Sequence, residues 1–139
     1  MLKRKRFGKN GERGQSMVEF VLVLPIFLLL VFGIVDFGMG FHAWLTVTNS
    51  AREGARLGAV RASSAQIVTR VQNTSDTLDP ANMTITVTNA QGNPGESVVV
   101  AVDYDYTLIT PLDNIMGMIS GGSVGPTITL SSTADMRLE

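Results

Sequence analysis

Residues 13–35 read RGQSMVEFVLVLPIFLLLVFGIV, and the sixteen residues from Phe20 to Val35 include no charged or strongly polar side chain. Glu19 stands immediately before this apolar run. A carboxylate in hydrocarbon is costly unless it is paired or protonated. The stretch therefore predicts a helix that lies in an apolar medium, and it requires a partner for Glu19.

The charges on either side of the run differ in sign. Residues 1–14 carry six basic side chains against Glu12, a net charge of +5, whereas residues 15–139 carry five Arg against eleven acids, a net charge of −6, and no Lys. Basic segments stay on the cytoplasmic side of a membrane. We therefore expect a cytoplasmic tail and an exported acidic remainder, and no nucleic-acid partner, because the basic tail has no interleaved aromatic residues.

Two ordinary interpretations of the run remain open. A cleaved secretory signal needs a small-x-small site beyond an apolar core of about 7–15 residues, and the nearest such site, residues 38–40, lies beyond Asp36. A permanent signal anchor needs about 20 apolar residues, a length that residues 17–41 reach if Glu19 and Asp36 are tolerated. Neither interpretation explains why a glycine, an acid and an aromatic residue precede the run at fixed spacing.

The spacing of Gly14, Gln15, Glu19 and Phe20 resembles the class III signal of type IV pilin-like proteins. In that family a prepilin peptidase cuts after the glycine, and Glu and an aromatic residue stand fifth and sixth in the product. The text of residues 13–38 and the segment NSAREGAR at residues 49–56 are similar to TadE-like proteins. These are minor pilins or pseudopilins of the tight-adherence (Flp/Tad) pilus system.

The resemblance implies a cytoplasmic leader, residues 1–14, that is removed between Gly14 and Gln15. It also implies that the new amine of Gln15 pairs with Glu19 of a neighbouring subunit; the alternative is that Glu19 caps the first turn of its own helix. The implied partners are prepilin peptidase, other pilin or pseudopilin subunits, the inner-membrane assembly platform of the tight-adherence system, and the lipid bilayer. The implied location is the bacterial inner membrane, crossed once, with incorporation into a surface pilus.

The helix is expected to continue beyond the membrane. A single helix over residues 15–62 would be roughly 70 Å long at about 1.5 Å per residue, with residues 17–41 in the membrane and the rest exported. Phe37, Phe41 and Trp44 recur at helical spacing and share one face. An aromatic belt at the membrane interface and packing against a neighbouring helix explain this face equally well.

Residues 63–139 show the pattern of a small exported α+β domain. Ser63 and Ser64 offer an N-cap, and apolar spacing predicts a short helix over residues 65–77. Alternating apolar residues predict three strands, at residues 83–88, 98–106 and 127–138, the first two forming a hairpin. A three-stranded sheet needs a cover, which the two helices can supply. The fold class is therefore α+β: a long N-terminal transmembrane helix, a short second helix and a three-stranded antiparallel sheet, an order similar to the pilin architecture.

No catalytic constellation is present in the sequence, which also has no Cys. Residues 121–125 match G-x-S-x-G, but a nucleophile elbow requires a later His, and the sole His, His42, lies upstream. Asp103 and Asp105 could bind a hard cation, although a solvated strand face is favoured. We expect no enzyme, no cofactor and no metal. The favoured function is a minor pilin or pseudopilin that assembles into, or helps initiate, a tight-adherence pilus. The alternative is an uncleaved single-pass protein that binds a cell-envelope partner.

Overall fold

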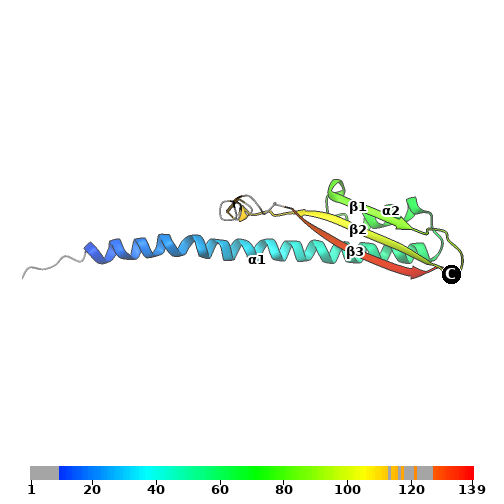
Figure 1. The fold of residues 1–139 in the computed structure, drawn as a ribbon, viewed down its shortest axis with the longest axis horizontal. Coiled ribbons are helices and arrows are strands. Elements are labelled where there is room, and N and C mark those ends of the chain that lie inside the picture. The colour runs from blue at the N-terminus through cyan, green and yellow to red at the C-terminus, as the bar shows by residue number, and fades with distance from the viewer. Residues whose placement is uncertain (1–9, 113, 116, 118–120, 122–126) are drawn as a thin grey trace, which may run out of the picture.

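A long helix, a short helix and a three-stranded antiparallel sheet form the fold, which confirms the predicted class (Figure 1). The structure, a computed structural model, describes residues 10–112, 114, 115, 117, 121 and 127–139. Its elements, in chain order, are α1 (Asn10–Ala59), α2 (Ser64–Thr74), a 3₁₀ turn η1 (Pro80–Asn82), β1 (Met83–Thr88), β2 (Ser97–Thr107) and β3 (Thr127–Arg137).

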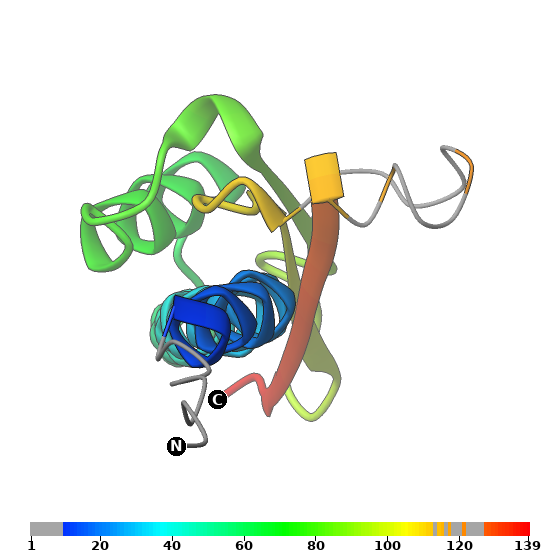
Figure 2. The same ribbon diagram turned by 90° about the vertical axis from the view of Figure 1, so that its left-hand side faces the viewer.

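Helix α1 dominates the molecule. Its 50 residues correspond to roughly 75 Å at about 1.5 Å per residue, and it runs through Pro25 without ending. Only the C-terminal part of α1 is covered by the sheet and by α2, whereas the N-terminal part projects alone (Figures 1 and 2). The expected projection of one helix well beyond its apolar run is thus confirmed.

Backbone geometry explains where the two helices end. Helix α1 stops at Ala59, before the expected residue 62, because Arg61 adopts a left-handed conformation with φ of 61°. Helix α2 begins after a capping box in which Ser63 and Gln66 bond to each other's backbone N–H groups. Helix α2 ends at Thr74 and not at the expected residue 77. At this end the Ser75 hydroxyl donates to the Val71 carbonyl at 2.8 Å.

The sheet is an antiparallel meander in the order β1-β2-β3. The predicted hairpin is confirmed by register pairs such as Ile85 with Val102, and β3 pairs with β2 along its whole length, Val100 facing Ala134. Alternate residues of β2 are buried, as the sequence predicts. Apart from Gly121, the G-x-S-x-G sequence at residues 121–125 lies outside the described residues.

Small residues on α1 allow the sheet and α2 to pack closely against it. Ala51 and Ala55 are fully buried in the same core cluster as the Val side chains of β2. A Cβ atom added at Gly54 would lie 2.6 Å from Val71 Cγ2, and one at Gly58 would lie 2.8 Å from Val98 Cγ1. Gly54 and Gly58 form a GxxxG sequence, which outside an apolar segment is only weak evidence of helix packing. In the structure both glycines lie against side chains of α2 or β2.

An ion pair at the surface also links α1 to α2. The Arg70 guanidinium donates to Glu53 Oε2 at 3.1 Å, and Arg56 donates to Glu53 Oε1 at 3.2 Å. The hydrogen bond from Arg70 holds the pKa of Glu53 below its ordinary value, against a smaller opposing effect of burial. Because the pair is exposed, it contributes to orientation more than to stability.

We predict that Gly54→Leu destabilises the protein by about 1–3 kcal/mol or more, the usual cost of overpacking, because its side chain would collide with Val71 and Val100. Gly38→Leu is the matched control, since an added Cβ there meets nothing within 4 Å. Thermal unfolding of the detergent-solubilised full-length protein measures both. Equal melting temperatures for the two variants would contradict the packing described.

The apolar helix and its junction with the sheet

The apolar run of α1 is largely exposed. Among the described residues, α1 is the one helix long and apolar enough to cross a membrane, and its most apolar window is not buried by the rest of the protein. Phe20 is 62% exposed, and Ile34, near the other end of the run, is 65% exposed. Since so large an apolar surface is not stable in water, the helix is suited to a single membrane span.

The predicted processing and pairing residues lie together on this exposed part of α1. Gly14 and Gln15 are helical and exposed, and the Gln15 side-chain amide donates to Glu19 Oε1 at 3.1 Å. This donor is neutral, so the contact does not neutralise the carboxylate. Because α1 begins at Asn10, Glu19 does not lie in the first turn of the uncut helix, where the helix dipole would stabilise it.

The three aromatic residues beyond the run do share one face of α1. The ring centroids of Phe37 and Phe41 are 6.3 Å apart, and those of Phe41 and Trp44 are 5.8 Å apart. Phe37 is 76% exposed. This arrangement confirms the predicted geometry, while the role of the face as an interface belt stays a prediction.

Asp36 forms the junction between α1 and the end of the sheet. It is only 4% exposed, and its Oδ1 accepts hydrogen bonds from the backbone N–H groups of Ile109 at 2.9 Å and of Thr110 at 3.2 Å. The Thr110 hydroxyl donates to Oδ2, and the Tyr106 hydroxyl donates to the Asp36 carbonyl at 3.4 Å. We call this set of contacts the Asp36 clip: it fastens the chain that leaves β2 to the helix.

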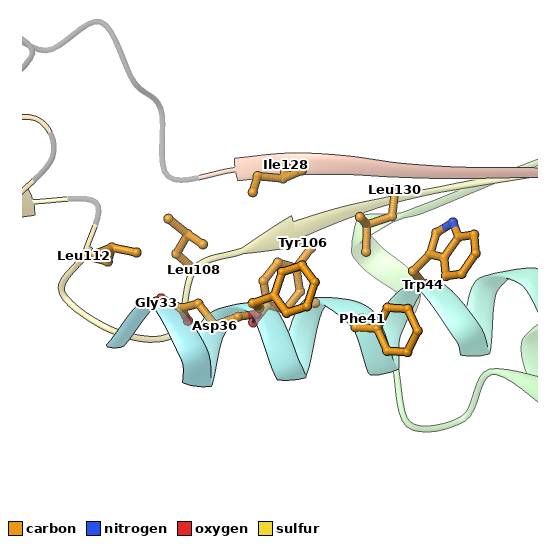
Figure 3. A pocket seen from close by; sticks show the side chains of 11 residues that line it. Gly33, Asp36, Phe41, Trp44, Tyr106, Leu108, Leu112, Ile128 and Leu130 are labelled. Carbon is orange, nitrogen blue, oxygen red and sulfur yellow. Dashed lines mark hydrogen bonds between the residues drawn. The ribbon is translucent and has the colours of Figure 1, made fainter. Parts of the chain in front are cut away.

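An apolar groove of about 410 Å³ lies beside the clip (Figure 3). From α1 it is lined by Gly33, Asp36, Phe37, Gly40, Phe41 and Trp44. From the sheet side it is lined by Tyr106, Leu108, Leu112, Ile128 and Leu130. Burial raises the pKa of the Tyr106 hydroxyl, and the neighbouring Asp36 carboxylate raises it further. The groove is thus shared between the helix and two segments of the chain that are distant from it in sequence.

The sequence did not reveal the clip or the groove. Asp36 is visible in the sequence as an acid at the end of the apolar run. No sequence pattern pairs it with residues 109 and 110, which lie more than 70 positions away. The other polar candidates remain at the surface: His42 is exposed, and Asp105 accepts a hydrogen bond from the Thr129 hydroxyl at 2.7 Å. Within the part of the chain that the structure describes, no three His, Asp or Glu side chains cluster as a metal site would require.

Comparison with known proteins identifies the N-terminal segment. The family model described as TadE-like protein matches residues 14–56. The matched segment begins at the predicted processing glycine and covers the exposed apolar helix, the aromatic face and most of the helix beneath the sheet. No curated protein and no solved structure matches the chain.

We predict that Asp36→Ala releases the chain after β2 from the helix. A hydrogen bond to a charged group is worth about 1.5–3 kcal/mol, so the amides of Ile109 and Thr110 should exchange with solvent at least tenfold faster without the carboxylate, as followed by hydrogen exchange. Asp105→Ala is the control, because its carboxylate lies on the outer face of the sheet. Unchanged exchange at both amides in Asp36→Ala would contradict the clip.

Proposed function

We propose that the chain is a minor pilin or pseudopilin that assembles through α1 into, or helps initiate, a tight-adherence pilus or secretion apparatus. The observation that carries this proposal is the exposed apolar half of α1, which lies within the TadE-like match and begins with the Gly14, Gln15, Glu19 and Phe20 pattern. The TadE-like family implies the Tad pilus system.

In the proposed pathway the leader, residues 1–14, stays in the cytoplasm, and prepilin peptidase cuts between Gly14 and Gln15. The charge distribution supports this orientation, because the leader carries +5 and the remainder −6. Gly14 and Gln15 are both exposed, which supports cleavage at this position. Other pilin or pseudopilin subunits and the inner-membrane assembly platform are the proposed partners of the processed protein.

Glu19 provides the proposed assembly contact. Cleavage would create an α-amine on Gln15, which is a cation at neutral pH because its pKa is ordinarily about 7.7–8.0. In hydrocarbon or in a filament core, an isolated amine and an isolated carboxylate are each costly, and pairing them between subunits removes most of that cost. The pair would also fix how far one helix is shifted along the next.

We predict that Glu19→Ala leaves membrane insertion, cleavage and folding of the sheet intact but impairs assembly. Removing one partner of a buried ion pair costs about 3–5 kcal/mol, which corresponds to a loss of more than about a hundredfold in association. The measurement is the amount of the protein recovered in sheared pili, or in the cross-linked secretion complex, relative to the amount in the membrane.

Asp76→Ala removes an equally exposed acid far from the apolar helix and should assemble normally. Normal assembly of Glu19→Ala would eliminate the pairing mechanism. Failure of the unmodified protein to enter any pilus or secretion complex would instead favour the uncleaved single-pass protein with an envelope partner.

A further inference from the structure

The groove beside the Asp36 clip lies at the height where the membrane should end. A hydrocarbon core of about 30 Å, centred on the middle of the apolar run near residues 27 and 28, reaches roughly ten residues in each direction at about 1.5 Å per residue. Its outer boundary therefore falls near residue 37. Of the residues that line the groove, Asp36 lies at this boundary, Gly33 about 6 Å inside it and Trp44 about 10 Å outside it, at about 1.5 Å per residue.

The exported domain itself reaches this boundary. Tyr106 and the chain up to Thr110 are hydrogen-bonded to Asp36, so this end of the sheet is held beside the end of the apolar run (Figures 1 and 3). Ile109 is 62% exposed and Ile128 is half exposed. Two apolar side chains of the domain are thus presented to whatever surrounds the helix at that height.

Two backbone N–H groups at this level already have an acceptor. Irregular backbone is excluded from hydrocarbon because its N–H groups have no partner there, but the Asp36 carboxylate accepts hydrogen bonds from the N–H groups of both Ile109 and Thr110. None of the residues that line the groove is Lys or Arg, so the groove has no site for an anionic headgroup. Its mainly apolar lining favours binding of a lipid acyl chain.

We propose that this end of the exported domain is seated in the headgroup–acyl boundary of the bilayer that α1 spans, with a lipid acyl chain in the groove. Phe41 and Trp44 on α1 and Ile109 and Ile128 on the domain form the contact. The groove is continuous with the apolar helix surface that lipid already covers, so the acyl chain extends an existing contact. The Asp36 clip holds this end of the domain at the boundary, while the rest of the domain projects from the membrane along α1.

The chain permits a direct optical test because Trp44 is its only tryptophan. In a Trp44→Phe background, Ile109→Trp places a probe on the domain. Val60→Trp places a matched probe on an exposed side chain just after the C-terminal end of α1, roughly 35 Å beyond the boundary at about 1.5 Å per residue. Each full-length variant is reconstituted in phosphatidylcholine vesicles, with or without bromine on the upper part of the acyl chains, and circular dichroism verifies the fold.

The expected result is blue-shifted emission of Ile109→Trp that brominated lipid quenches at least twofold, with no quenching of Val60→Trp.

Adding Asp36→Ala should reduce the quenching at residue 109 to the level seen at residue 60, and unchanged quenching would overturn the role of the clip. Red, unquenched emission at residue 109 would show a domain free of the membrane. Blue but unquenched emission would show that protein, such as a second copy, and not lipid covers residue 109. Either result overturns the proposal, and neither depends on pilus assembly, since the purified protein is measured in vesicles.

Discussion

Helix α1 has two different surfaces that must both be covered, and the rest of the structure depends on this constraint. Over its C-terminal half, α1 carries Ala and Gly on the side that meets the sheet, and the Val side chains of β2 reach these small residues directly. Over its N-terminal half the same helix carries large apolar side chains in every direction and is covered by nothing else in the described chain. The C-terminal half of α1 therefore needs the sheet against it, and the N-terminal half needs lipid or other helices around it.

The Asp36 clip marks the change from one surrounding to the other. A buried carboxylate is costly unless its oxygens accept hydrogen bonds, and here the chain that leaves β2 supplies two backbone donors and a hydroxyl. The same contact removes two N–H groups that would otherwise face an apolar boundary. The acid at the end of the run is therefore a structural anchor, and it aligns the end of the sheet with the end of the apolar segment. That alignment makes the proposed lipid contact possible.

The sequence predicted the elements well because each has a strong local pattern. The uninterrupted apolar run, the capping serine at Ser63 and the alternation along β2 all led to the observed structure. Helix ends were less accurate, because a left-handed Arg61 and a hydroxyl bond from Ser75 are not visible in a pattern. The clip and the groove could not be predicted, since they join residues far apart in the chain. The processing site and the Glu19 pair rest on the resemblance and remain predictions.

The most direct test of the account is the N-terminal sequence and intact mass of the protein extracted from membranes of cells with and without prepilin peptidase. The account predicts a new N-terminus at Gln15 that appears only when the peptidase is present. Retention of residue 1 in the presence of the peptidase would contradict the pilin pathway and leave a plain membrane anchor. A cut near Gly40 would contradict the membrane-bound state itself, because it would separate the domain from the apolar half of α1.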